Sequence, residues 1–275
     1  MADIHYISSL HLNKMNILKI GIGVILVESV TAQVSTAMGS QTTASGEYST
    51  AMGYHTTASG EYSIAMGYLT RATGKASTAM GRGTRATGEY STAMGYYTTA
   101  SGVGFETSSY STAMGYGTKA NGEKSTAMGS QTVASGEYST AMGFKTTATG
   151  KASTAMGFET IASDYASVTI GQYNSAGSSV TSSSTSYDAD NTAFVIGNGN
   201  VISSVLVRSD AFKVMFNGDA MVSNDLTVSG ELKIGGQVLT SANVADLLKL
   251  LTQLAGSPDD QKACLKTKWN ALSTC

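Results

Sequence analysis

The chain has 275 residues, a formal net charge of −2 and 13% charged residues, against about 25% in a typical soluble protein. This near-neutral balance predicts neither nucleic acid nor an anionic membrane surface as a partner. The two Cys and three His exclude a zinc ribbon, a Cys-ligated cluster and a disulfide-dense scaffold. We therefore predict no metal, no cofactor and no enzymatic activity.

Residues 1–32 are expected to be a signal peptide, with Met15 as the true initiator. One Lys, an apolar run at 20–27 and then Val30-Thr31-Ala32 follow this Met, and small residues before a cut suit signal peptidase. The run is too short to span a bilayer, which needs about 20 apolar residues. The mature chain is thus expected to be secreted or on the cell surface, without a membrane span. A buried N-terminal strand or helix is the alternative.

Residues 33–177 carry a 14-residue repeat with the unit A-M-G-x-x-T-x-A-[S/T]-G-x-x-S-T. Ala-Met-Gly occurs nine times, and a single longer step contains six extra residues around 104–109. A short fixed period indicates a solenoid, and 14 residues are too few for a helix–turn–helix unit. Slots that alternate with period 2 predict two short strands and two tight corners per coil. The expected fold class is an all-β parallel β-roll of about ten coils.

The alternation places Thr50 and Met52 on one strand face and Ala51 on the other. Because the Thr50 slot holds only apolar or β-branched residues, we expect that face to form the coil core, with its methionines at Met38, Met52, Met66, Met80, Met94, Met114, Met128, Met142 and Met156. The uniform Ala slot implies that another backbone comes close. We expect a homotrimer with an axis lined by Ala37, Ala51, Ala65, Ala79, Ala93, Ala113, Ala127, Ala141 and Ala155. Selection for a flat strand, or recent duplication, is the alternative.

In the second strand, Thr56 and Ala58 are expected to face inward, because the slot between them admits Arg and Lys and so faces solvent. The Gly that recurs from 46 to 150 marks a corner expected to need a positive φ. Asp164 takes this slot in the ninth copy, and Asp tolerates the left-handed region.

This unit resembles the head repeat of trimeric autotransporter adhesins, the YadA-like head family with Hep/Hag-type repeats. The resemblance covers about residues 34–177. It implies a left-handed parallel β-roll, a homotrimer, a cell-surface location and adhesion to an extracellular protein or glycan. By slot, Thr50 and Met52 correspond to the family's inward Val and Ile, and Ala51 to its inter-subunit residue. Met replaces Ile in every clean coil, which gives a more adaptable core.

Residues 178–240 are predicted to form a β-rich connector, in which Asn217-Gly218 signals a hairpin. Residues 241–275 are predicted to be helical, either as a coiled coil on a 3-4-3 leucine seam or as a plain amphipathic helix. Cys264 and Cys275 are a candidate disulfide, within one chain or between chains. No amphipathic membrane strands follow, so the family's membrane anchor is not expected.

A candidate ligand face consists of Arg71, Lys75, Arg82 and Arg85 on coils three and four, with a solvated charged surface as the alternative. Tyrosines also recur at one corner, where they either bind ligands or cover coil edges. His55 is expected to be a solvated corner residue. We favour a trimeric adhesin-like protein over a viral or phage tail fibre and over an ice-binding solenoid, whose outward Thr row would be broken by the Arg and Lys residues.

Overall fold

The computed structural model describes residues 34–103, 109–227, 232–234 and 237–239. The chain divides into two compact units, Met1–Asn224 and Asp225–Cys275. The expected signal peptide, the helical tail at 241–275 and both Cys residues lie outside the described residues. Within the described ranges there is no helix of the length and apolarity needed to cross a bilayer.

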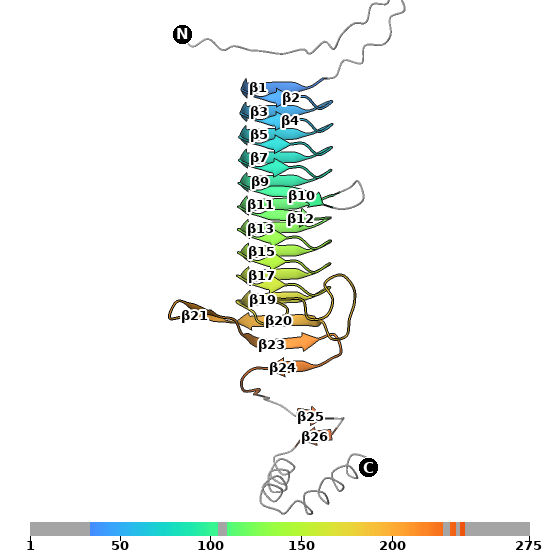
Figure 1. Cartoon of the computed structure of the whole chain (residues 1–275), viewed down its shortest axis with the longest axis vertical. Helices are drawn as coiled ribbons and strands as arrows, with labels where there is room; N and C mark the ends of the chain where they lie inside the picture. Colours follow the sequence, from blue (N-terminus) through green and yellow to red (C-terminus); the bar gives the residue numbers. More distant parts are fainter. Residues whose placement is uncertain (1–33, 104–108, 228–231, 235–236, 240–275) are drawn as a thin grey trace, which may run out of the picture. The chain divides into compact units, whose positions relative to one another are not determined.

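The first unit is a parallel β-solenoid, in which each coil contributes one long strand and one short strand (Figure 1). The long strands of the coils are β1 (Thr36–Ser40), β3 (Thr50–Tyr54), β5 (Ile64–Tyr68), β7 (Thr78–Arg82), β9 (Thr92–Tyr96), β11 (Thr112–Tyr116), β13 (Thr126–Ser130), β15 (Thr140–Phe144), β17 (Thr154–Phe158) and β19 (Val168–Gln172). The short strands are β2 (Thr43–Ala44), β4 (Thr57–Ala58), β6 (Arg71–Ala72), β8 (Arg85–Ala86), β10 (Thr99–Val103), β12 (Lys119–Gly122), β14 (Val133–Ala134), β16 (Thr147–Ala148) and β18 (Ile161–Ala162).

Equivalent repeat positions lie directly beside each other in neighbouring coils. In β3 and β5, for example, Ala51 pairs with Ala65 and Met52 with Met66. The long strands belong to a 13-stranded sheet, and the short strands form a nine-stranded sheet. The predicted all-β parallel solenoid is therefore confirmed, with nine complete coils and a tenth long strand, β19, in the described residues.

The coil interior is filled by small side chains from both strands. Ala51, Thr56, Ala58 and Ser63 are each 0% exposed, as are their counterparts in the other inner coils. The inward orientation predicted for Thr56 and Ala58 is confirmed. The buried alanines form one continuous core cluster along the solenoid.

The predicted orientation of the long strands is wrong. Met52 and its counterparts are partly exposed on the outer side of the 13-stranded sheet, while the Ala row lies inside the coil. The misplaced core residues are Met38, Met52, Met66, Met80, Met94, Met114, Met128, Met142 and Met156. The misplaced axis residues are Ala37, Ala51, Ala65, Ala79, Ala93, Ala113, Ala127, Ala141 and Ala155. Packed sheets filled by larger side chains stand about 10 Å apart, and a coil whose two strands are joined by a two-residue corner leaves no such space.

Seven of the eight corner glycines do not have a positive φ and are needed instead for close stacking, the exception being Gly102 with φ 44. A Cβ on Gly60 would lie only 2.0 Å from the carbonyl oxygen of Gly74 in the next coil. Positive φ occurs at other corner positions, such as His55 (φ 51) and Tyr62 (φ 56). Asp164 is the last residue of this column, and its side chain is accommodated because it accepts hydrogen bonds from Thr181 N and Thr192 N.

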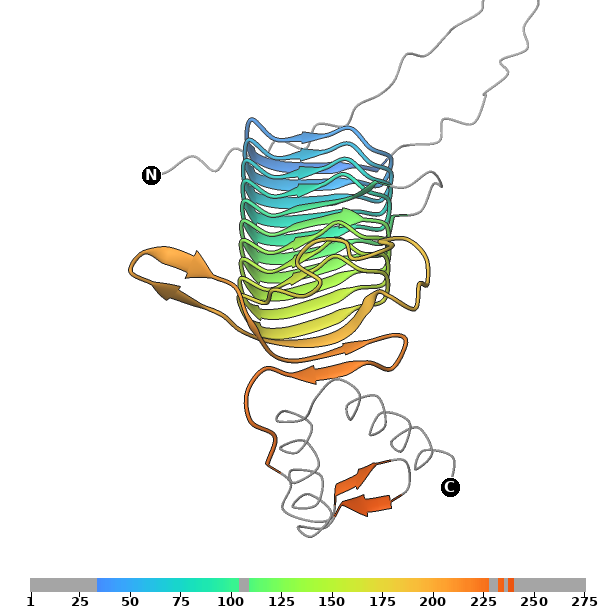
Figure 2. The same ribbon diagram turned by 60° about the horizontal axis from the view of Figure 1, so that its bottom comes forward.

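The sheet continues beyond the repeats into the predicted connector. Strand β20 (Thr192–Asn198) pairs in parallel with β19, and β23 (Asp210–Met215) and β24 (Ala220–Val222) follow in antiparallel order. Between them, the hairpin of β21 (Asn200–Ile202) and β22 (Val205–Val207) projects from the solenoid (Figure 2). The second unit contains the hairpin of β25 (Leu232–Ile234) and β26 (Gln237–Leu239). The division between the two units, after Asn224, lies within the predicted connector of residues 178–240.

Three side chains close the C-terminal end of the coil stack. The amide of Asn174 accepts a hydrogen bond from Ile161 N and donates one to Ile161 O, both at 2.8 Å, so it pairs the edge strand β18. The buried carboxylate of Asp164 accepts from Thr181 N and Thr192 N, and that of Asp210 holds the loop after β19. A paired edge strand does not offer a template for further strand addition.

Candidate functional site

The outer side of the 13-stranded sheet carries a row of methionines, which we call the methionine face. It consists of the outward-facing positions of the long strands, which are Thr50 and Met52 in β3 and the equivalent residues in the other coils. Ile64 and Val168 replace Thr in two coils, and Ile170 replaces Met in β19. The methionine side chains thus form a continuous, partly exposed apolar row along the stack, beside a row of mostly Thr side chains.

An aromatic column runs along the end of the long strands. Tyr54 stacks on Tyr68 with ring centroids 5.3 Å apart, and Tyr96 stacks on Tyr116 at the same distance. Between these pairs, the guanidinium carbon of Arg82 lies 5.4 Å and 5.3 Å from the rings of Tyr68 and Tyr96. Such cation–π contacts hold the side chain between two rings. Arg82 therefore completes an aromatic stack.

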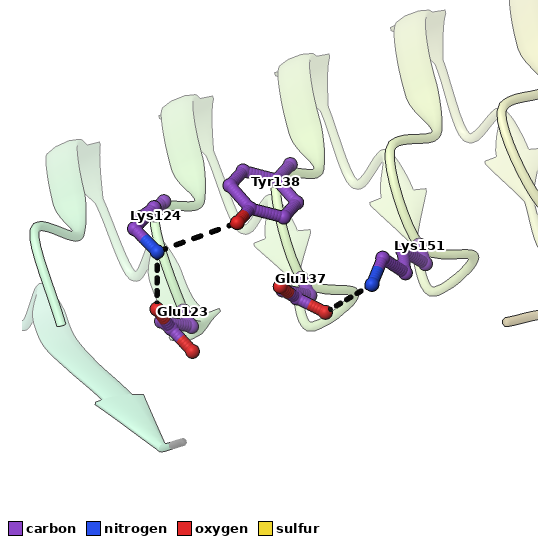
Figure 3. A network of polar contacts seen from close by, with 5 residues as sticks. All are labelled: Glu123, Lys124, Glu137, Tyr138 and Lys151. Atoms are coloured by element: carbon purple, nitrogen blue, oxygen red, sulfur yellow. Dashed lines mark hydrogen bonds and ion pairs between the residues drawn. The ribbon is translucent and has the colours of Figure 1, made fainter. Parts of the chain in front are cut away.

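The opposite corner holds alternating charges and tyrosines. Lys124 contacts both Glu123 and Tyr138, and Lys151 lies 2.8 Å from Glu137 of the preceding coil (Figure 3). A hydrogen bond from Lys151 lowers the pKa of Glu137, and the same bond raises the pKa of Lys151. The hydrogen bond to Glu123 raises the pKa of Lys124. These exposed pairs keep the corner close to neutral.

A shallow groove of about 450 Å³, which we call the arginine groove, lies over the nine-stranded sheet. It is lined by Gln41, His55, Thr57, Leu69, Arg71, Gly83, Arg85, Tyr97 and Thr99. Arg71 and Arg85 are register partners in β6 and β8, and both are exposed. Tyr97 forms one wall, because its ring packs edge-on against Tyr96 and lies over Gly83, where a Cβ would come within 2.7 Å of it.

The four predicted ligand residues do not form one face. Arg71 and Arg85 lie together in the arginine groove. Lys75 lies at the charged corner, 2.9 Å from Glu61, and Arg82 lies in the aromatic column. Sequence reasoning missed the groove contributions of Tyr97 and Gly83, although both occupy the slot of His55 in their own coils.

Comparison with known families gives a direct match to the repeats. The model of the YadA head domain repeat (2 copies) matches nine overlapping segments between residues 34 and 174, interrupted only at 105–106. The chain belongs to the YadA head family. This family is of a structural, adhesin type. Comparison with curated proteins gives no match.

Membership in the YadA head family confirms the resemblance found in the sequence. The matched segments cover the coils that carry the methionine face, the aromatic column and the arginine groove. The candidate binding surfaces are therefore features of the head itself.

Proposed function

We propose that this protein is a secreted or cell-surface adhesin whose chains form a trimer through the methionine face. The observation that carries the proposal is the unbroken apolar row on the outer side of the long sheet in a YadA-type head. Large contiguous apolar patches on soluble proteins mark interaction sites. In a trimer, each chain would cover the methionine face of a neighbouring chain. The arginine groove lies on the other sheet and would stay open to ligands.

The projecting hairpin supports association with further copies. Val201, Ile202, Val205, Leu206 and Val207 are between 43% and 63% exposed. An isolated two-stranded hairpin is marginally stable in water, and apolar side chains on both strands need a partner. The hairpin leaves β20 beside the end of the aromatic column, since Gly199 N donates a hydrogen bond to Gln172 O. A neighbouring copy would cover it.

The remaining parts of the proposal concern the ends of the chain. Residues 1–32 would direct secretion, and residues 241–275 would form a helical tail that joins the chains. Adhesion would then be multivalent, because three heads present the same surface at once.

Light scattering of the purified chain at several concentrations tests the trimer. The expected mass is three times that of the single purified chain, which is 28.3 kDa when residues 1–32 are retained. Replacing Met94 and Met114, neighbours in β9 and β11, by Lys should give monomers, because two charges would face the apolar surface of the next chain. Thr99→Lys on the other sheet is the control and should stay trimeric, since Lys119 already occupies that slot. A folded wild-type monomer would refute the proposal.

Adhesion is tested with beads coated with the protein and layered on cells or extracellular matrix. Specific retention of wild-type beads, against beads coated with an unrelated protein, is expected. Equal retention of both kinds of bead contradicts the adhesive function but leaves the trimer standing.

The Thr slot of the same face favours ice binding as a second candidate. Threonine occupies it in six consecutive coils from Thr78 to Thr154, so hydroxyls repeat at the strand spacing of about 4.8 Å. This row differs from the outward row of the short strands, which Arg71, Arg85 and Lys119 interrupt. A thermal-hysteresis measurement distinguishes the two functions, because an adhesin gives no hysteresis.

A further inference from the structure

We propose that the arginine groove binds the anionic group of an acidic carbohydrate, a carboxylate or a sulfate on a sugar chain. This inference names the ligand class of the proposed adhesin and rests on that function. The established family membership assigns no ligand to these residues.

The first argument is the unpaired positive charge of the groove. Arg71 and Arg85 are adjacent in the parallel ladder, so their backbones are about 4.8 Å apart. None of the groove-lining residues is acidic. The four ion pairs found among the described residues involve Lys side chains and lie at the corners. Two guanidiniums side by side without a counter-charge favour binding of an anion between them.

The second argument is the chemistry of the lining. A guanidinium offers a planar fork of donors that matches a carboxylate or sulfate with two parallel hydrogen bonds. The exposed ring of Tyr97, held by Tyr96 and Gly83, presents an apolar face for the C–H groups of a sugar ring. Thr57, Thr99 and Gln41 supply hydroxyl and amide groups that pair with sugar hydroxyls.

The third argument is that the groove does not suit a peptide strand. Extended peptides bind by adding to an unpaired sheet edge. The strands below the groove, β4, β6 and β8, each pair with a neighbour on both sides. Recognition must therefore come from side chains, and the lining combines charge, one aromatic wall and several small polar groups in the manner of a sugar site.

The test measures binding of the purified full chain to four immobilised polymers at physiological ionic strength. Dextran sulfate carries sulfates, hyaluronan carries carboxylates, dextran is the neutral control and poly-glutamate represents an acidic peptide. We expect binding to dextran sulfate, to hyaluronan or to both, and none to dextran. The two charged glycans distinguish which anion is preferred.

Matched variants separate the groove from overall charge. The double variant Arg71→Thr, Arg85→Thr introduces the Thr that the flanking coils carry at the same repeat position. It should lower glycan affinity at least about tenfold, because charge-assisted hydrogen bonds are lost. The double variant Lys75→Gln, Arg82→Tyr also removes two positive charges, but at positions outside the groove. It should leave the glycan affinity within about twofold of wild type. Tyr97→Gln should weaken glycan binding while both arginines remain.

Three outcomes overturn the inference: no binding to either charged glycan, equal loss in both double variants, or poly-glutamate bound as tightly as the glycans. The bead assay keeps this failure apart from failure of the adhesive function. If the Arg71→Thr, Arg85→Thr beads adhere like wild type, the groove is not the binding site although adhesion stands. If wild-type beads do not adhere but the glycans bind, the groove is a binding site and the adhesive function is wrong.

Discussion

Gly136→Ala tests the close stacking of the coils, which the solenoid depends on. Gly136 lies in the corner after β14 and is buried. A Cβ there would lie 2.1 Å from Gly150 O, 2.6 Å from Gly150 C and 2.8 Å from Thr149 O. Gly136 does not have a positive φ, so alanine fits its backbone conformation and the conflict is purely steric.

The expected destabilisation follows from how far the corner must move. Ordinary contacts of a Cβ begin near 3.4 Å, so the corner has to shift by more than about 1 Å. Ser135 N and Gly136 N donate to Ala148 O at 2.9 Å and 3.2 Å, and Ser139 N donates to Gly136 O at 3.1 Å. Overpacking costs about 1–3 kcal/mol and each lost hydrogen bond about 0.5–1.5 kcal/mol. We expect the free energy of unfolding to fall by about 3–5 kcal/mol.

Urea denaturation at one fixed protein concentration measures this effect. Gly218→Ala is the control for backbone strain, because Gly218 has φ 94 and no atom within 4 Å of its added Cβ. That variant should lose only about 1–2 kcal/mol. If Gly136→Ala unfolds within about 0.5 kcal/mol of wild type, the corner column is not closely packed and the account of the glycines is wrong.

Two further predictions concern the end and the charged corner of the solenoid. Asn174→Ala leaves the backbone N–H and C=O of Ile161 in β18 unpaired, so we expect about 2–4 kcal/mol lower stability and faster amide exchange at Ile161; unchanged exchange would contradict the capping role. Lys151 lowers the pKa of Glu137 below its usual 4.5, so the contribution of this pair is present above about pH 4.5 and is lost as the pH falls through the lowered value. In the variant Lys151→Gln, the pKa of Glu137 should return toward 4.5, as measured by an NMR titration. A pKa that stays low would exclude Lys151 as the cause.

Most of the fold was predictable because the repeat is short and its substitutions differ by slot. The 14-residue period predicted the length of one coil, and the alternation of slots predicted two short strands and two corners in each coil. The slot that holds Arg71 and Lys119 had to face solvent, and it does. The last coil was not predictable from periodicity. There the Asn174 side chain, and not a further short strand, pairs the edge of the sheet.

The corner glycines show how one substitution pattern fits two causes. Asp164 in place of Gly agrees with a left-handed corner, which Asp tolerates, and equally with the end of a closely packed column. The structure decides for the second cause, because Gly150 is the last glycine whose Cβ would meet the backbone of a following corner. At Asp164, the side chain instead accepts hydrogen bonds from Thr181 N in the following loop and from Thr192 N at the start of β20.

The candidate site was predicted only in part, because closeness in sequence was taken for closeness in space. Arg71 and Arg85 share a slot and lie together. Lys75 and Arg82 occupy other slots, and each slot of a coil faces a different direction. In a solenoid, residues that share a slot in successive coils form a surface. The slot of His55 shows this, since Tyr97 and Gly83 belong to it and complete the groove.

The orientation of the alanine row could have been decided by size. A uniform Ala slot and a uniform Met slot are equally consistent with burial between chains or within one coil. The two inward slots of the short strand, Thr56 and Ala58, are also small, and a thin interior accepts only small residues from both sides. Methionines inside would need the sheets to separate toward about 10 Å. With alanine inside, the chain closes its own core and presents methionine outward. The methionine face is therefore the apolar surface that the proposed trimer would cover.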